Sequence, residues 1–371
     1  MYSTPPNPYQ QPYDNGFPPS GGARSAGPVP PPYGAYGIPP ADPYRLEIRR
    51  EKKMVRRHGN QLYALVILAI ATAGIAQAVF SFPVYLADWL HNTSRAAFQL
   101  HYGWGVVLVQ ALPILLGELV LLLIGYRLLD RGIRWNGSGE PDKKKQAGLT
   151  LFGSLACAGG WAAAELVTLV LVLLFSLFGM NFSAGGITVP TQTGPRIAML
   201  LFLYLASPLL EEFIFRGMLL NNLRRYGEKF AVISSALLFV FFNFRFDGLL
   251  RSLLFGLILG FLAVRTGNIW VPVAARLLAE WVIWGANEWL GAMKSGIPAL
   301  LFVAAALLAF VLFAALNAGK LPKAPSPEAP MLRTGQKVSA SISGACAVLG
   351  IIAYVLMNIS TILGSFVLRL I

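Results

Sequence analysis

Charged residues, histidine and cysteine are all scarce in this chain of 371 residues. Charged side chains make up only 13% of the sequence and hydrophobic residues 56%, whereas a soluble domain of this length needs more charge to cover its surface. The two cysteines, Cys157 and Cys346, both lie in apolar segments, which argues against a disulfide framework and against a zinc ribbon. The composition therefore indicates a polytopic membrane protein.

The formal net charge of +13 raises the question of nucleic-acid binding. The basic residues, however, form short clusters beside apolar segments, and the densest cluster occupies residues 45–58, directly before the first apolar segment. Such clusters are typical of loops that stay in the cytoplasm and contact anionic lipid. We therefore expect a multi-pass protein of the cell membrane with a cytoplasmic N-terminus, whose partner is the lipid bilayer and not nucleic acid.

The first 44 residues are rich in proline, tyrosine and glycine and contain no cleavable signal peptide. A segment of this composition buries too little apolar surface to offset its ordering entropy, so it is predicted to be a disordered cytoplasmic tail. Its polyproline character and spaced tyrosines suit docking of a protein partner, although the composition alone favours a passive solvated tail. Residues 45–60 then form a basic juxtamembrane segment.

The rest of the chain alternates long apolar segments with short polar loops, which predicts an all-α fold, a transmembrane helical bundle of about nine spans. The expected spans are residues 62–86, 104–129, 150–179, 196–225, 230–244, 249–264, 269–290, 296–316 and a last one from 341 onward. They group into N-terminal spans (61–195), a core (196–290) and C-terminal spans (291–371). No inverted repeat is evident, which argues against a secondary transporter.

The fourth span carries Glu211, Glu212 and Arg216. Ionisable residues inside a span cost about 2.5–3.5 kcal/mol each and usually face a protein interior or a water-filled cavity. Glu212 and Arg216 are four residues apart, so they lie on one helical face and can pair, while Glu211 is rotated by about 100° and is left available. An available carboxylate suits a general acid or base, and the alternative is a structural ion pair with a spare acid.

Two further features concern packing. Glu118 and Glu165 are isolated acids within spans; they could line a cavity, but a packing role with a backbone or hydroxyl partner is expected for each. Gly256 and Gly260 form a GxxxG motif in the sixth span, which predicts close helix contact within the bundle.

Three motifs in the core form a recognisable set. They are EEFIFRG at residues 211–217, FVFFN at residues 239–243, and FGLILGFLAVRTGNIWVPV at residues 255–273. Together they resemble the CPBP family of intramembrane proteases, which includes the type II CAAX prenyl endopeptidases, over roughly residues 196–290. The resemblance implies an endopeptidase that hydrolyses a membrane-embedded peptide or a prenylated substrate.

The resemblance also assigns roles to individual residues. In the family, the first glutamate of the EExxxR motif activates the hydrolytic water, and that position is Glu211 here. The second glutamate and the arginine are Glu212 and Arg216. The second motif of the family ends in a histidine, whose position holds Asn243 in this chain.

The third family motif, HxxxN, falls on Arg276 and Glu280, so both motif histidines are missing. The chain has only three histidines, at positions 58, 91 and 101, and none lies in the core. Without an imidazole, Glu211, Asn243 and Glu280 make a poor zinc ligand set, and Arg276 adds a permanent cation. The sequence therefore indicates no metal and no cofactor.

Three hypotheses remain. In the first, Arg276 closes the site by bonding to Glu211 or Glu280, and the protein is a pseudoenzyme with a degenerate site. In the second, Glu211 still activates water, with Asn243 and Arg276 as polarising donors, as in a metal-free acid protease. In the third, the protein is a non-catalytic adaptor that recruits partners through its tail.

Overall fold

The structure is a computed structural model that describes residues 43–91, 103–130, 132–133, 142–178, 187–243, 248–292, 296–317, 319–320 and 332–370. Of the predicted disordered tail, residues 1–42 lie outside this part of the chain. Every regular element in the described residues is a helix, which confirms the predicted all-α fold.

The first half of the chain forms two long helices and, between them, three consecutive helical segments. They are α1 (Pro43–His91), α3 (Gly103–Val106), η1 (Val107–Ala111), α4 (Leu112–Leu128) and α5 (Lys143–Leu177). The basic juxtamembrane segment is thus continuous with the first apolar span in a single helix, α1.

The second half begins with one interrupted helix and continues with regular ones. The interrupted helix consists of α6 (Thr193–Leu201), η2 (Phe202–Ala206), α7 (Ser207–Glu212), η3 (Phe213–Leu219), α8 (Leu220–Leu223) and η4 (Arg224–Tyr226). It is followed by α9 (Glu228–Asn243), α10 (Leu249–Thr266), α11 (Trp270–Ala292), α12 (Ile297–Asn317), α13 (Thr334–Ile342) and α14 (Ala345–Leu370).

Six helical stretches of the described chain are long and apolar enough to cross a membrane, and a seventh counts if α13 and α14, bent by 74°, form one broken span. Helices also occupy the fifth and seventh expected spans. However, α9 has only 16 residues, and Arg276 and Glu280 lower the hydropathy of α11. The polytopic helical bundle is confirmed, while the count of nine spans stays a prediction.

Small residues bring the helices of the bundle close together. α5 packs against α10, α11 and α12. A Cβ atom on Gly159 of α5 would lie 2.0 Å from the carbonyl oxygen of Ala306 in α12, so only glycine fits there. A Cβ atom on Gly256 of α10 would lie 2.7 Å from the Cβ of Ala236 in α9. The close contact expected for the GxxxG motif is therefore present, between α10 and α9.

Three fully buried phenylalanines lie where η3, α9 and α10 pack together: Phe215, Phe239 and Phe255. The rings of Phe215 and Phe239 meet edge to face with centroids 5.0 Å apart. This aromatic centre excludes water from the region where the charged side chains of the core converge.

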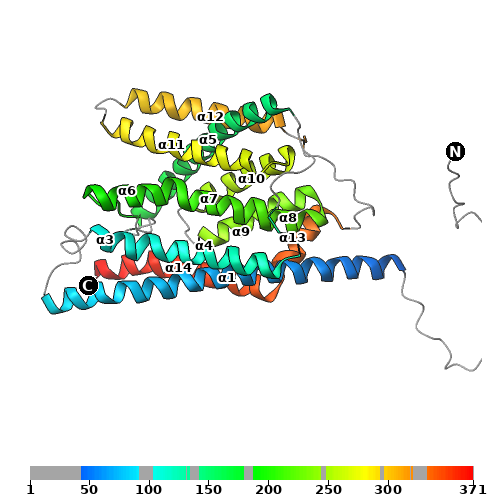
Figure 1. The fold of residues 1–371 in the computed structure, drawn as a ribbon, viewed down its shortest axis with the longest axis horizontal. Helices are drawn as coiled ribbons and strands as arrows, with labels where there is room; N and C mark the ends of the chain where they lie inside the picture. Colours follow the sequence, from blue (N-terminus) through cyan, green and yellow to red (C-terminus); the bar gives the residue numbers. More distant parts are fainter. Residues whose placement is uncertain are drawn as a thin grey trace, which may run out of the picture. The chain divides into compact units, whose positions relative to one another are not determined.

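The interrupted helix runs through the bundle as one line of segments (Figure 1), and α7 contacts α11 on one side and α4 on the other. Pro208 lies in the first turn of α7. It has no backbone N–H and its ring crowds the carbonyl group four residues earlier, which accounts for the π-helical turn of η2 just before it. A second π-helical stretch, η3, carries Arg216.

Candidate functional site

Glu212 and Arg216 form the ion pair expected from their spacing. Arg216 Nη1 lies 2.9 Å from Glu212 Oε1, and both side chains are almost completely buried. The contact is ionic but poorly aligned, because neither atom has a hydrogen-bond partner among the described residues. Arg216 also donates from Nη2 to the carbonyl oxygen of Phe255 over 3.4 Å.

Arg276 joins two helices through a second ion network. Its Nη2 atom donates to Glu211 Oε2 over 3.1 Å and also lies 3.1 Å from Glu280 Oε1. Glu211 is on α7, whereas Arg276 and Glu280 are one turn apart on α11. The expectation from helix geometry that Glu211 is available is therefore wrong, because its partner comes from another helix, which the spacing within one helix does not reveal.

Both guanidinium groups rest on aromatic rings. The Arg216 guanidinium carbon lies 4.6 Å from the ring centroid of Phe239, and that of Arg276 lies 5.7 Å from the same centroid. Arg276 is also 4.6 Å from the ring centroid of Phe255. Cation–π contacts of this kind stabilise buried guanidinium groups, so the two phenylalanines belong to the site. Phe239 begins the second sequence motif and Phe255 the third, but the sequence does not indicate that either ring supports an arginine.

Asn243 is held differently. It is the last residue of α9, and its Nδ2 atom donates to the carbonyl oxygen of Phe239, one turn back, over 2.9 Å. No hydrogen bond joins Asn243 to Glu211 in the described part of the chain. The structure thus brings five of the six predicted site residues into two ion networks and ties the sixth to its own helix.

Glu118 of α4 lies beside this site, and the packing role with a hydroxyl partner is the role expected for it. Its side chain is completely buried, and Oε1 accepts a short hydrogen bond from the hydroxyl group of Ser207, one turn before Glu211. Its other oxygen, Oε2, has no hydrogen-bond partner within the described residues. The expected hydroxyl partner is therefore present. Glu165, by contrast, is exposed on α5.

The charges of the site do not balance fully. The two networks contain three carboxylates, from Glu211, Glu212 and Glu280, and two guanidinium groups. Arg251, exposed in the first turn of α10, is close enough to interact electrostatically with Glu211. Pairing of this kind makes buried charges tolerable in a membrane protein and holds α7 against α11.

The arrangement gives little support to metal chemistry. Within the described residues, no group of three or more His, Cys, Asp or Glu side chains is placed to hold a metal ion. The guanidinium group of Arg276 lies between Glu211 and Glu280, where it would repel a cation.

Residues 193–282 match the family model described as "Type II CAAX prenyl endopeptidase Rce1-like". This segment is about a quarter of the chain, runs from the start of α6 into α11, and contains both ion networks and Asn243. The match confirms the resemblance drawn from the three sequence motifs. No curated protein and no solved structure matches the chain.

Proposed function

Since this chain belongs to the CPBP family, through a core that matches the type II CAAX prenyl endopeptidase-like model, we propose that it is a pseudoenzyme. It keeps the membrane-embedded core of the family and does not hydrolyse peptide bonds. It resides in the cell membrane with its N-terminus in the cytoplasm, and its core binds a membrane-embedded or prenylated peptide segment without cleaving it.

The position of Arg276 carries this proposal. A catalytic carboxylate must accept a proton from a water molecule within about 2.6–3.2 Å. Arg276 Nη2 occupies that distance from Glu211 Oε2, and a guanidinium group stays protonated and has no acceptor atom. The same nitrogen also contacts Glu280, so the two acids and the arginine form a closed group across α7 and α11. This oxygen of Glu211 is therefore already engaged by a cation.

Asn243 supports the same conclusion. To stabilise the oxyanion of a tetrahedral intermediate, a donor must point at the place where that charge develops. One amide hydrogen of Asn243 is already donated to the carbonyl oxygen of Phe239, at the end of its own helix. The position of the second motif histidine therefore offers no imidazole, and only the second amide hydrogen of Asn243 is left as a donor.

The proposal is tested with the purified full chain in proteoliposomes that contain a fluorescent farnesylated peptide. We expect saturable peptide binding by fluorescence anisotropy, and no cleavage product by mass spectrometry above that of the Glu211→Gln variant. Glu165→Gln, which changes an exposed acid, is the matched control. Cleavage by the wild-type protein that is lost only in Glu211→Gln would establish an active glutamate-based protease, and absence of binding would refute the binding role.

A truncated chain separates core binding from recruitment by the tail. If peptide binding persists after deletion of residues 1–44, the binding site lies in the helical core. Loss of binding on deletion, with the helical content unchanged by circular dichroism, would favour the adaptor hypothesis instead.

A further inference from the structure

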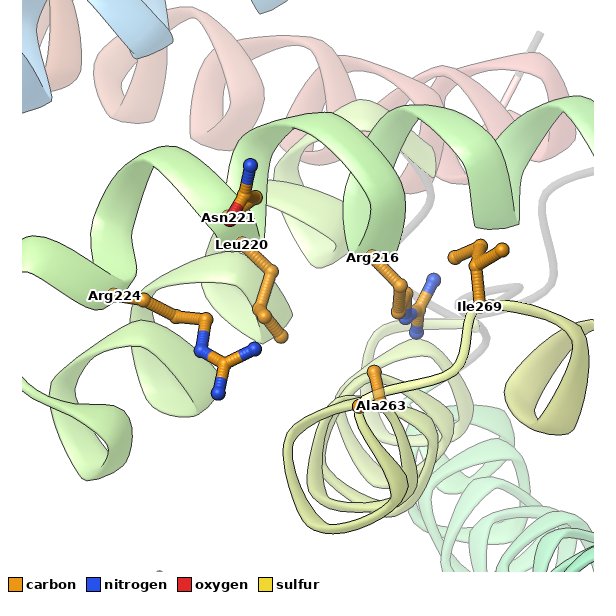
Figure 2. A pocket seen from close by; sticks show the side chains of 7 residues that line it. Arg216, Leu220, Asn221, Arg224, Ala263 and Ile269 are labelled. Carbon is orange, nitrogen blue, oxygen red and sulfur yellow. The ribbon is translucent and has the colours of Figure 1, made fainter. Parts of the chain in front are cut away.

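A pocket opens between the end of the interrupted helix and the turn from α10 to α11. It comprises about 250 Å³, counting the open space at its mouth. Its polar lining comes from Arg216, Asn221 and Arg224, and its apolar lining includes Leu220, Ala263 and Ile269. Figure 2 shows Arg216 and Arg224 on either side of Leu220, with Ala263 and Ile269 across from the interrupted helix.

We propose that this pocket binds a phosphate group of the kind carried by phospholipid headgroups. The site is distinct from the pairing of Glu211 with Arg276, and the proposal does not depend on whether the core hydrolyses peptides.

The buried arginine supplies the first reason. Arg216 is only 3% exposed, yet it lines the pocket, and its Nε and Nη1 atoms have no hydrogen-bond partner among the described residues. Nη1 faces Glu212 Oε1 in a poorly aligned ion pair, and Nε makes no such contact, so both atoms keep N–H groups without a hydrogen bond. A buried donor without a partner costs about 1–3 kcal/mol, and more when it is charged. An anionic oxygen bound in the pocket could satisfy such a donor of Arg216.

Arg224 supplies a second cation at the pocket. Its Nε and Nη2 atoms both donate to Glu228 Oε1, over 3.1 and 2.7 Å, which fixes the orientation of the guanidinium plane. Its third nitrogen, Nη1, forms no bond within the described part of the chain. A phosphate group has several acceptor oxygens and suits two guanidinium groups better than a single carboxylate would.

The surroundings favour an anion from the membrane surface. Several helix ends meet beside the pocket. They are joined by hydrogen bonds from Asn221 to the carbonyl oxygen of Gly132, from Arg225 to Asp130, and from Lys337 to the carbonyl oxygen of Tyr226. Lys229 is exposed at this end of the bundle and Arg265 is half-buried there, whereas Arg225 is neutralised by Asp130 and the buried Lys337 by Glu51. Basic residues near a membrane surface attract anionic headgroups by about 1 kcal/mol each.

The mixed lining of the pocket fits a lipid. One non-bridging oxygen can approach the arginines that line the pocket, while Leu220 and Ile269 offer apolar surface to the adjoining glycerol and acyl carbons. Arg216 is the arginine of the EExxxR motif and contacts Glu212 as well as lining the pocket. A phosphate bound there would therefore contact the same guanidinium group as Glu212. Lipid binding would thus act directly on the core of the protein.

The experiment compares binding of phosphatidylglycerol by the full chain and three variants in neutral detergent, measured by native mass spectrometry. Arg224→Gln removes a pocket cation, and Ala263→Leu fills the pocket without changing any charge. Arg225→Gln is the matched control, because this neighbouring arginine bonds to Asp130 outside the pocket. Variants are compared only after circular dichroism and gel filtration show that they are folded and monodisperse.

We expect phosphatidylglycerol affinity to fall at least tenfold in both Arg224→Gln and Ala263→Leu, and less than twofold in Arg225→Gln. Competition with glycerol 3-phosphate and inorganic phosphate identifies the source of the phosphate group. If these soluble phosphates displace phosphatidylglycerol at low concentration, the ligand is a soluble phosphate; if they do not displace it, the ligand is a lipid. Three results would each overturn the proposal: no binding by the wild-type chain, unchanged affinity in both pocket variants, or an equal loss in Arg225→Gln.

Discussion

Replacement of Arg276 tests the ion network that closes the core. In Arg276→Met, Glu211 and Glu280 each lose a guanidinium contact of 3.1 Å while staying buried or half-buried. At an effective dielectric constant of about 20, each contact is worth about 5 kcal/mol before desolvation is subtracted. Measured losses on breaking a buried pair are about 3–5 kcal/mol, because the remaining charge has no partner.

Thermal unfolding in detergent, followed by intrinsic tryptophan fluorescence, measures this loss. We expect the midpoint of Arg276→Met to fall by about 5–10 °C, from a shift of roughly 2 °C per kcal/mol for a long chain. The double variant Arg276→Met with Glu211→Gln should recover part of the loss, since one unpaired charge is then gone. Arg196→Met, at an exposed arginine of α6, is the control and should change the midpoint by less than 2 °C on the same basis.

The double variant also decides whether the reasoning holds. If Arg276→Met destabilises no more than Arg196→Met, the network contributes nothing and Arg276 is not needed to neutralise Glu211. If Arg276→Met is destabilised but Glu211→Gln brings no recovery, the loss comes from packing against Phe239 and Phe255 and not from the unpaired carboxylate.

Other substitutions probe the packing around the site. Gly256→Ala should destabilise by about 1–3 kcal/mol, because the new Cβ atom would meet backbone and side-chain atoms of Ala236 at 2.8 and 2.7 Å. Gly260→Ala should cost less, since its nearest neighbour is a side-chain methyl group at 3.3 Å; equal unfolding midpoints would contradict this reading. Glu118→Ala should lose about 1–3 kcal/mol because Ser207 loses its acceptor, while Glu118→Gln keeps an acceptor and should retain most of the stability in the same unfolding assay.

Local spacing allowed part of this structure to be predicted from the sequence. Long apolar runs predict helices directly, and the pairing of Glu212 with Arg216 follows from their separation by four residues in one helix. The tight turn after α10 is also readable in the sequence. Gly267 adopts a left-handed conformation with φ of 64°, and the Asn268 side chain accepts a hydrogen bond from the backbone N–H of Trp270.

Contacts between distant segments could not be predicted in the same way. The sequence placed Arg276 at a histidine position but left open whether it would contact Glu211 or Glu280, and the structure has both contacts. That outcome depends on how α11 is rotated against α7, which is set by packing across many residues. The π-helical turns of the fourth span rotate the side chains that follow them, relative to a regular helix of 3.6 residues per turn. The spacing in the sequence therefore does not predict which face of the span these side chains occupy.

The two arginines of the core are linked through their shared aromatic contact. Arg216 and Arg276 both lie over Phe239, at 4.6 and 5.7 Å from its ring centroid, and Arg216 also bonds to the backbone of Phe255, whose ring lies under Arg276. A displacement of Arg216 toward the phosphate pocket would therefore change the packing that holds Arg276 between Glu211 and Glu280. If both proposals hold, anionic lipid should alter the unfolding midpoint of the wild-type chain more than that of Phe239→Leu, because the smaller side chain breaks the link between the two guanidinium groups. An equal lipid effect in both proteins would mean that the pocket and the core act independently.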